Sequence, residues 1–389
     1  MAIKRGIFVK KPRIAFVTLA DLPLPAVNGG AVENLIDVLS DINELEQCMD
    51  ISIYSIEGVE DIPQKSNTRY FYYRKKHERK ISLKSILFKL NGKVILNKTM
   101  RNVIKRINKE KYDFVIVTSI IRELYDFATA SSAPVIWYLH GDAVEVLGKE
   151  WVYRISEKCA AIIAVSDFVG NRVKDTGTNT SVHVVKNCSD ILPLENCVTE
   201  ARREVRSMAG VDEEIVFAYV GRIVPIKGVL ELVKAFIKAG RLDAKLLIVG
   251  ESDNMNTDYY DEVRTQANDD TIFIGYVPHD ELNKIYCAVD VVVVPSVCNE
   301  AASLAVIEAQ RCGKYVIAAN KGGIAEYAAP NMTTMVDGDG EVFEKNLSKA
   351  IQGYDSNIQR FCKSSLQEHT PRTFYEDFVK CVYELSEKN

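Results

Sequence analysis

The chain has 389 residues, of which 47% are hydrophobic and 26% charged, and a net charge of −4, values typical of a soluble globular protein long enough for two domains. No run approaches the roughly 18 uninterrupted apolar residues of a membrane-spanning helix. The nine cysteines are scattered without a CxxC pair, which favours buried free thiols in a reducing cytosol over a disulfide framework or a zinc site.

Short β-rich apolar segments alternate with amphipathic segments of helix length, the pattern of parallel sheets with crossover helices. The first, residues 13–20, follows basic residues as in a signal peptide, but it is short and is followed by Asp21, so we interpret it as a strand. The predicted strands are residues 13–20, 50–56, 112–118, 134–140, 160–166, 182–186, 215–221, 245–250, 271–276, 289–295, 315–319 and 333–336.

A charged stretch rich in loop-forming residues, 187–212, separates the two series of strands. We therefore predict two Rossmann-like α/β domains, residues 1–195 and 196–370, each a doubly wound parallel sheet. A last helix, 371–389, follows a proline start and is expected to pack back on the first domain. Two such sheets in series are expected to face a cleft, where the carboxyl ends of both sets of strands approach one ligand.

Two glycines, Gly29 and Gly30, directly precede an amphipathic helix that begins near Ala31. Glycines there allow a close backbone approach to a ligand, and the helix N-terminus offers unpaired N–H groups to an anion. A tight turn into a helix explains the same pattern, so the two glycines alone carry little weight.

Residues 69–112 hold fifteen Lys or Arg against two Glu, a balance of +13, so the remainder of the chain carries −17. From residue 81 to residue 111, apolar positions with helical spacing are interleaved with the basic ones. This combination suits an anionic membrane surface, and region 69–111 is the candidate contact. Nucleic acid is not the expected partner because no reading motif is present. A solvated helix pair is the remaining alternative.

Residues 221–228 (GRIVPIKG) link a predicted strand to a helix that begins at Val229. Arg222 and Lys227 stand five residues apart on this loop and can converge on one diphosphate, the arginine as a fork and the lysine as a point charge. The alternative is a solvated basic loop, which a buried strand ending in Gly-Arg disfavours.

A four-valine strand, residues 291–294, runs into a small-residue turn and then a helix within residues 295–309. The turn places Glu300 at the carboxyl edge of the strand, where ligands bind in such sheets. Glu308 lies in an otherwise apolar helix face, where a carboxylate needs hydrogen bonds such as those from sugar or ribose hydroxyls. The N–H groups of residues 302–304 would face a phosphate. The alternative is a surface loop glutamate and a helix glutamate paired with Arg311.

In combination, these motifs resemble glycosyltransferase family 4, a large retaining family with the GT-B fold of two Rossmann-like domains. Glu300 and Glu308 have the spacing of its E-x7-E motif, and residues 221–228 are similar to its GR…KG loop. The resemblance covers nearly the whole chain. The other similar segments are 275–296 (G-Y, L, Y, D and PS), 322–326 (GGxxE), Gly29-Gly30, His140-Gly141, 164–166 and Asn187.

The resemblance implies acceptor recognition mainly in the first domain and donor binding mainly in the second. It implies that Arg222 and Lys227 hold the donor diphosphate. Glu308 would bind the ribose and Glu300 the hydroxyls of the transferred sugar, while His140 would lie beside the sugar at the reacting centre. The other residues expected to contact the donor are Gly29, Gly30, Tyr276, Val277, Ser303 and Leu304.

The implied activity is a retaining, metal-independent transfer of a hexose-type sugar from a nucleotide diphosphate sugar to a saccharide or lipid-linked acceptor, in cell-surface polysaccharide or glycoconjugate synthesis. Uridine diphosphate is expected on prevalence alone, with no further cofactor. The expected location is the cytoplasm, peripherally at the inner face of the plasma membrane. The alternatives are a nucleotide-sugar epimerase on the same fold and a non-catalytic nucleotide-sugar binder.

Two segments depart from the family pattern. Residues 301–303 read Ala-Ala-Ser instead of Gly-Phe-Gly, and residues 187–190 read Asn-Cys-Ser-Asp instead of Asn-Gly-Val-Asp.

Asp337 and Asp339 have the DxD spacing of metal-dependent glycosyltransferases, but they lie in a glycine-rich turn after a predicted edge strand. Since no Cys/His ligand cluster is present, we interpret this pair as a solvated turn and expect no metal site.

Overall fold

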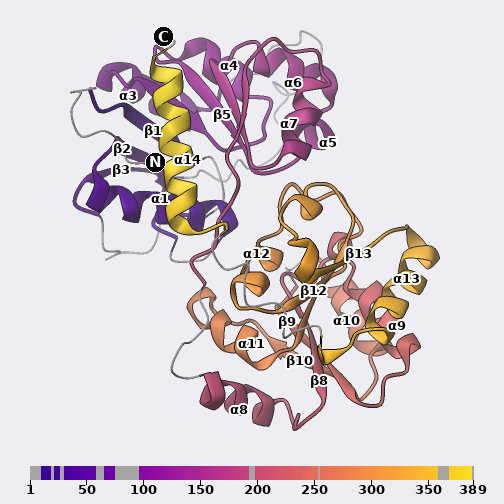
Figure 1. Ribbon diagram of the computed structural model, residues 1–389. Helices are drawn as coiled ribbons and strands as arrows, with labels where there is room; N and C mark the ends of the chain where they lie inside the picture. The colour runs from indigo at the N-terminus through magenta and orange to yellow at the C-terminus, as the bar shows by residue number, and fades with distance from the viewer. Residues whose placement is uncertain are drawn as a thin grey trace. The chain divides into compact units, whose positions relative to one another are not determined.

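A computed structural model describes residues 10–18, 22–26, 30–57, 65–74, 96–191, 198–252, 255–357 and 368–387. The chain divides into two compact units, Met1–Lys186 with Pro371–Asn389, and Asn187–Thr370 (Figure 1). The first unit thus ends at Lys186, earlier than the expected boundary near residue 195. The charged stretch that follows belongs to the second unit.

Within the described residues, the first unit has a seven-stranded, all-parallel sheet in the order β3-β2-β1-β4-β5-β6-β7. Its strands are β1 (Arg13–Val17), β2 (Asp50–Ile56), β3 (Thr68–Tyr73), β4 (Phe114–Val117), β5 (Val135–Leu139), β6 (Ala161–Ala164) and β7 (Val182–Val184). Its helices are α1 (Ala31–Glu46), α3 (Lys98–Glu110), α4 (Leu124–Ala130), α5 (Ala143–Leu147), α6 (Lys149–Ser156), α7 (Asp167–Lys174) and α14 (Pro371–Ser386).

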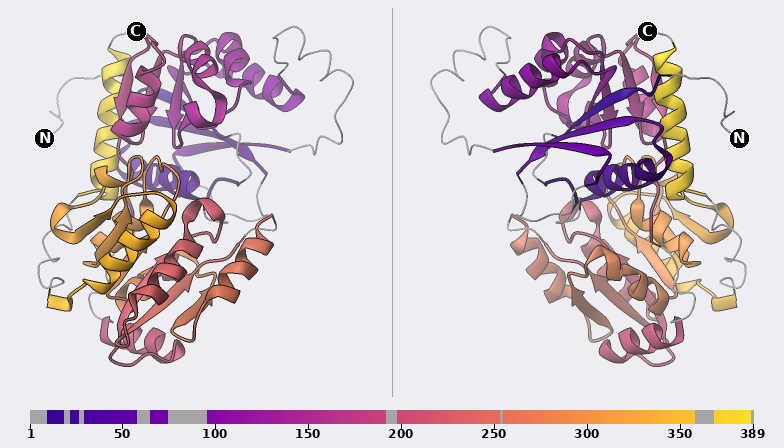
Figure 2. Two further views of the ribbon diagram at one scale, coloured as in Figure 1. Left: turned by 90° about the vertical axis from the view of Figure 1, so that its right-hand side faces the viewer. Right: turned by 90° about the vertical axis from the view of Figure 1, so that its left-hand side faces the viewer.

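Helix α14 belongs to the first unit, where it packs beside α1 (Figures 1 and 2). Phe378 is fully buried, and its ring centroid lies 5.8 Å from that of Phe16 and 5.9 Å from that of Tyr138. The hydroxyl of Tyr375 donates to Asn43 Oδ1 in α1 at 3.0 Å. The last helix therefore completes the core of the first unit over one face of its sheet.

The second unit has, within the described residues, a six-stranded parallel sheet in the order β10-β9-β8-β11-β12-β13. Its strands are β8 (Ile215–Val220), β9 (Ala244–Val249), β10 (Thr271–Gly275), β11 (Val291–Val294), β12 (Tyr315–Ala319) and β13 (Thr333–Val336). Its α-helices are α8 (Val198–Met208), α9 (Val229–Ala239), α10 (Thr257–Gln266), α11 (Leu282–Ala288), α12 (Leu304–Arg311) and α13 (Gly340–Gln352).

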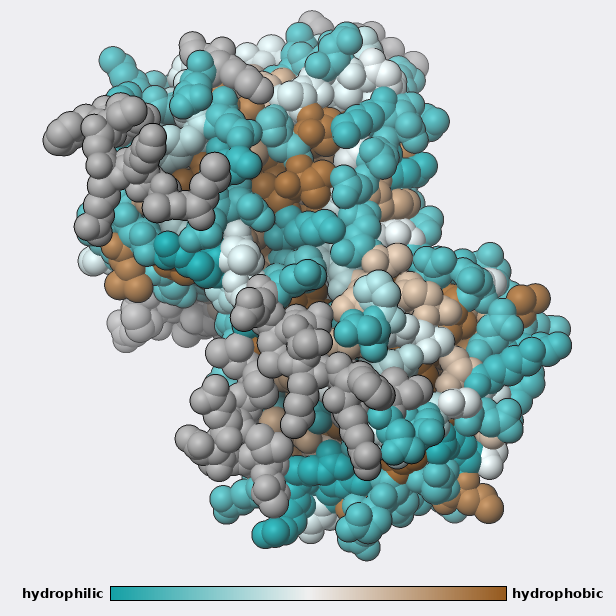
Figure 3. Space-filling view, viewed as in Figure 1, coloured by the Kyte–Doolittle hydropathy of each residue, from teal (hydrophilic) through white to brown (hydrophobic). Residues whose placement is uncertain are grey.

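The four valines of β11 show why this strand is apolar throughout. Val291 and Val293 belong to the core on one face of the sheet, and Val292 and Val294 to the core on the other. A strand covered by helices on both faces has no polar side, so the alternation of a half-exposed strand is absent. The outer surfaces of α8 and α13 are mostly hydrophilic, as expected for helices that cover such a sheet (Figure 3).

Each of the twelve predicted strands matches a strand of the structure, but β3 was not predicted. Its sequence, TRYFYY, has one buried, two exposed and three partly buried residues at the edge of the sheet. It overlaps the basic region 69–111 and was not predicted, although threonine and aromatic residues are typical of strands. Within that region, residues 75–95 lie outside the described residues, and α3 is its described helix. Among the helices described, none has both the length and the apolar content to cross a bilayer.

Both sheets contain a point at which the strand order reverses, between β1 and β4 and between β8 and β11. Loops that leave two such neighbouring strands diverge to opposite faces and open a crevice at the carboxyl edge, where ligands bind. In the second unit these loops are residues 221–228 and 295–303, which hold the motifs singled out from the sequence.

The ends of β8 and β9 approach each other so closely that a side chain cannot fit. Gly250 has a φ of +133°, and a Cβ at this position would lie 1.9 Å from the carbonyl oxygen of Gly221. We expect Gly250→Ala to lower the free energy of unfolding by about 3 kcal/mol, from backbone strain and overpacking together. Urea denaturation followed by fluorescence measures this loss.

The matched control is Gly240→Ala, because Gly240 also has a positive φ, +62°, but no atom lies within 4 Å of the added Cβ. This variant should lose only the strain contribution, about 1–2 kcal/mol. Equal losses in the two variants would show that the approach of Gly250 to Gly221 does not constrain the loop after β8.

Candidate active site

The loop after β8, residues 221–228, is held by its backbone. The hydroxyl of the buried Tyr219 donates to the carbonyl oxygen of Arg222 at 2.6 Å. The N–H of Ile223 donates to the carbonyl oxygen of Glu251 at 2.9 Å. The Arg222 side chain is exposed and, among the described residues, forms no ion pair. A restrained backbone with an exposed guanidinium is suited to binding an anion.

The loops after β8 and β11 touch through their backbones. Gly228 has a φ of +68°, and a Cβ there would lie 2.0 Å from the carbonyl oxygen of Pro295. The N–H of Val297 donates to the carbonyl oxygen of Ile226 at 3.1 Å. The two loops can meet only if residue 228 is glycine. This explains why a glycine follows Lys227.

Lys227 and Glu300 form an ion pair across these loops. Lys227 Nζ lies 2.8 Å from Glu300 Oε1, and the two side chains are 27% and 9% exposed. The hydroxyl of Ser296 donates to the same oxygen of Glu300. Within the described residues both bonds go to Oε1, so Oε2 retains its capacity to accept a hydrogen bond from a ligand hydroxyl.

The backbone of Glu300 is fixed by a third loop, which follows β12. Gly323 N–H donates to the carbonyl oxygen of Glu300 at 2.7 Å, and Gly322 pairs with Glu300 in an isolated parallel bridge. Gly322 has a φ of +61°, and a Cβ there would lie 2.3 Å from that same oxygen. In the strand order, β11 lies between β8 and β12. Glu300, which follows β11, is therefore held on one side by the loop of Lys227 and on the other by the Gly-Gly turn predicted at 322–326.

Glu308 is buried in α12 and receives a hydrogen bond from α11. The hydroxyl of Tyr286 donates to Glu308 Oε2 at 2.6 Å. Burial raises the pKa of Glu308, and the bond from Tyr286 opposes that rise. The alternative that Glu308 pairs with Arg311 is not supported: within the described residues no such ion pair forms, and Arg311 Nε donates to the carbonyl oxygen of Ile191 at 3.2 Å.

A second ion pair lies near Glu308. His279 Nε2 and Asp190 Oδ1 are 2.9 Å apart, and their hydrogen bond raises the pKa of His279 and lowers that of Asp190. The charge of Glu308 also raises the pKa of His279. The sequence contained no signal for this pair, because its members are 89 positions apart.

The remaining predicted donor contacts of the second unit differ in exposure. Ser303 is buried at the N-cap of α12 but makes no capping hydrogen bond, so the helix begins at Leu304 without a side-chain cap. Tyr276, directly after β10, is 63% exposed. Val277 packs against the core, so it would reach a ligand through its backbone.

His140 lies at the carboxyl end of β5 in the first unit. Its ring centroid is 4.1 Å from that of Tyr138. Both ring nitrogens are buried, and neither forms a hydrogen bond among the described residues. Burial lowers the pKa of His140 to about 3, so the imidazole is neutral near pH 7. A neutral imidazole can both donate to and accept from the hydroxyls of a ligand.

Gly30 is the N-cap residue of α1 and has a φ of +107°. A Cβ there would lie 2.3 Å from Glu33 Oε2 and 2.7 Å from Leu22 Cδ1. Both atoms are ends of flexible side chains that can move aside, so the positive φ is the main reason for glycine at this position. Gly29 lies outside the described residues.

Asp337 and Asp339 lie in the turn between β13 and α13. Asp337 Oδ1 accepts from Asn320 Nδ2 at 2.8 Å, and Asp339, which is 86% exposed, pairs with Lys321. This arrangement agrees with a solvated turn at the edge strand β13. Among the described residues, no three His, Cys, Asp or Glu side chains are grouped to hold a metal ion. The seven cysteines in that part of the chain are free thiols.

Two residues that contact the site were given no role from the sequence, although Ser296 belongs to the PS motif of segment 275–296. Ser296 donates to Glu300, and Tyr219 restrains Arg222. Both lie at or just after the ends of the strands whose loops were singled out. Their positions next to a motif were the available signal, but a serine or a tyrosine in a sequence does not indicate which group it will bond to.

The buried carboxylate of Glu308 leads to a pH-dependent prediction. Because burial raises its pKa above the ordinary 4.5, folding favours the protonated form, and the resulting stability is lost as the pH rises through the raised pKa. We expect Glu308→Gln, which keeps an acceptor for Tyr286, to be more stable than the unaltered protein at neutral pH. The difference should shrink as the pH falls.

Thermal unfolding of both proteins from about pH 4 to about pH 8 tests this expectation. Glu341→Gln, at an exposed position in the first turn of α13, is the control and should change the pH profile little. A Glu308→Gln protein that is less stable at neutral pH would show that the charged carboxylate stabilises the fold.

Two family models match the chain. The model of glycosyl transferases group 1 matches residues 202–360, and that of glycosyltransferase family 4 matches residues 67–191. Among relatives, YtcC of Bacillus subtilis, whose name also describes a glycosyltransferase, is 26% identical over 344 residues, 83% of this chain and 79% of that protein. The lipopolysaccharide 1,2-N-acetylglucosaminetransferase of Salmonella typhimurium is 34% identical over 131 residues, 31% of this chain and 34% of that protein.

Solved structures show the same fold. HepE of Anabaena, in a complex with UDP-glucose, superimposes with a TM-score of 0.74 at 17% identity, covering 96% of this chain and all of that one. A glycosyltransferase of Rickettsia africae gives a TM-score of 0.73 at 19% identity, with 98% of this chain covered and all of that one. The chain therefore belongs to the group 1 glycosyltransferases of the family 4 type, enzymes with the GT-B fold.

Proposed function

We propose that this glycosyltransferase transfers a hexose-type sugar from a UDP-sugar to a saccharide or lipid-linked acceptor, with retention of anomeric configuration and without a metal ion. The UDP and UDP-glucose complexes of HepE support the choice of nucleotide. The name of the Salmonella relative, a lipopolysaccharide N-acetylglucosaminetransferase, supports a role in cell-surface polysaccharide or glycoconjugate synthesis.

The observation that carries the proposal is the ion pair of Lys227 with Glu300 at the reversal point of the second sheet. It places a cation and a carboxylate side by side at the carboxyl edge, where a cation for the phosphates and an acceptor for sugar hydroxyls are needed together. Arg222 supplies a second, exposed cation on the same loop.

In the proposed reaction, the bond between the sugar and the diphosphate breaks, and negative charge develops on the leaving UDP. Lys227, held by its ion pair with Glu300, stabilises that charge from a position set before the reaction begins, as electrostatic catalysis requires. The exposed Arg222 adds a second cation. In a retaining transfer the acceptor approaches the same face of the sugar, so the leaving phosphate can take the proton of the acceptor hydroxyl.

The other residues take supporting roles in this proposal. Glu308 accepts a hydrogen bond from the ribose and Glu300 from the transferred sugar, while neutral His140 binds a sugar hydroxyl at the reacting centre. The uncapped start of α12, at Ser303 and Leu304, faces a phosphate. Further contacts to the donor come from Tyr276, Val277, Gly29 and Gly30.

We also propose a cytoplasmic location, peripherally at the inner face of the plasma membrane, through the basic region 69–111. Its support is charge: fifteen Lys or Arg against two Glu over residues 69–112. Anionic lipid headgroups attract such a segment by about 1 kcal/mol per basic residue near the surface.

The choice of nucleotide can be tested by ligand-induced stabilisation. A UDP-sugar at about 100 times its dissociation constant should stabilise the protein by about 2.7 kcal/mol, whereas GDP- and ADP-sugars at the same concentration should stabilise it little. Thermal shift measures the three side by side, with and without EDTA. Stronger stabilisation by GDP- or ADP-sugars would overturn the choice of UDP, and loss of the UDP-sugar effect in EDTA would overturn metal independence.

The two cations of the loop after β8 should be needed for turnover. Arg222→Gln and Lys227→Gln should each lower transition-state stabilisation by about 2–4 kcal/mol, by analogy with removal of one oxyanion-binding donor. Transfer from a radiolabelled UDP-sugar to a membrane or glycan extract measures kcat/KM. Lys234→Gln, an exposed site on α9, is the control and should leave turnover unchanged.

Full turnover in the Arg222→Gln enzyme would contradict the proposed electrostatic role. Product analysis without an acceptor distinguishes the alternatives: an epimerase converts the UDP-sugar by itself, and a non-catalytic binder yields no product with any extract. Either outcome would replace the proposed transfer.

A further inference from the structure

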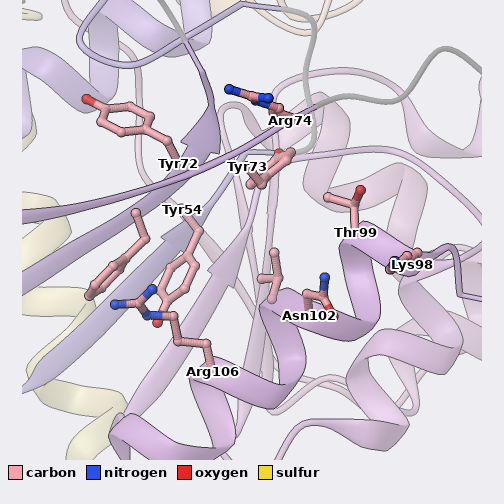
Figure 4. Close-up of a pocket in the computed structure, with 10 residues that line it drawn as sticks. Tyr54, Tyr72, Tyr73, Arg74, Lys98, Thr99, Asn102 and Arg106 are labelled. Carbon is pink, nitrogen blue, oxygen red and sulfur yellow. The ribbon is translucent and has the colours of Figure 1, made fainter.

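A pocket of about 370 Å³ lies in the first unit, and its lining includes none of the residues assigned to the donor. It is an open pocket lined by the carboxyl end of β3, by β2 at Tyr54 and by α3 (Figure 4). Its volume is in the range of small-molecule sites, about 300–1,000 Å³. Because β3 ends and α3 begins there, the pocket opens at the carboxyl edge of the sheet.

One side of the pocket is aromatic. Tyr54 and Phe71 pack with ring centroids 4.8 Å apart, and Tyr73, on the same face of β3 as Phe71, adds a third ring. The hydroxyl of Tyr73 donates to the carbonyl oxygen of Thr18, and Tyr54 is only 1% exposed. The ring surface that a ligand can reach therefore comes from the partly buried Phe71 and Tyr73.

The other side of the pocket is cationic. Lys98 and Arg106 of α3 and Arg74 after β3 line it, and the Arg106 guanidinium lies 4.0 Å from the centroid of the Phe71 ring. Among the described residues, Arg74 has an exposed partner, Glu57 at 2.9 Å, whereas Lys98 and Arg106 have no carboxylate partner. The charges that face the pocket are therefore largely uncompensated.

An exposed, basic strip of α3 continues from the pocket. Asn102 and Arg106 line the pocket, and Lys105, Lys109 and Glu110 follow them along the helix. The pocket and this strip, together called the groove, hold five cations and one carboxylate among the described residues. A ligand longer than one ring would remain in contact with positive charge along this groove.

We propose that this groove binds an acidic saccharide, a sugar unit that carries a carboxylate or a phosphate, as part of the acceptor. The aromatic side matches the apolar C–H face of a pyranose ring, and the guanidinium of Arg106 matches a carboxylate or phosphate through paired N–H groups. Asn102 and Thr99 supply polar groups for the hydroxyls. This inference rests on the proposed function in taking the acceptor to be a saccharide.

Direct binding tests the proposal without turnover. Saturation-transfer NMR and titration calorimetry on the full chain would compare glucuronate and glucose 6-phosphate with neutral glucose. We expect both acidic sugars to bind more tightly than glucose, and Arg106→Gln to weaken them at least about tenfold, the effect of one charged hydrogen bond. Arg101→Gln is the matched control for the change in charge, because Arg101 is exposed on the same helix but does not line the groove.

Equal binding of glucose and the acidic sugars, no binding of any of them, or equal weakening by Arg101→Gln would overturn the proposal. So would binding of phosphatidylglycerol vesicles that depends on Arg106 when no acidic sugar binds, because the groove would then belong to a lipid surface. UDP-sugar stabilisation is measured on the same samples: if it persists while the acidic sugars fail to bind, the groove assignment fails and the transferase proposal stands.

Discussion

The backbone contact between the loops after β8 and β11 is the constraint on which the proposed donor site depends. Gly228 allows the first loop to meet Pro295 at a distance that any side chain would prevent, and Gly322 allows the loop after β12 to meet Glu300 in the same way. Lys227 and Glu300 are therefore brought together by three loops in backbone contact. Electrostatic catalysis needs this rigidity, because the charges must be in place before the leaving group develops its own.

The free-energy cost of burying a carboxylate is offset in different ways at Glu300 and Glu308. An ionised carboxylate is expensive to bury unless it is paired or hydrogen-bonded. Glu300 has both a cation, Lys227, and a hydroxyl, Ser296, as partners. Glu308 has the hydroxyl of Tyr286, and its pKa is raised by burial. The first arrangement suits a site of concentrated charge, and the second suits a hydrogen bond to a neutral ribose hydroxyl.

The first unit uses the carboxyl edge of its sheet for different chemistry. Neutral His140 lies after β5 with two buried nitrogens, and the groove beside α3 combines aromatic rings with cations. In the proposed function, His140 binds sugar hydroxyls at the reacting centre, and the groove binds the charged group of an acidic acceptor. Helix α14 is connected to His140 through packed aromatic rings. Its Phe378 packs against both Phe16 and Tyr138, and Tyr138 packs against His140.

The sequence by itself determined the two parallel sheets, twelve of the strands, and the loop positions of Arg222, Lys227 and Glu300, because hydrophobic patterning and glycine-rich turns are local properties. The partners of these residues were decided by the tertiary structure. Lys227 and Glu300 are 73 positions apart, and Tyr286 and Glu308 are 22 apart on different helices, so neither pairing has a local signature. A residue's charge can be read from its type, but its partner is set by which loops the strand order brings to one edge.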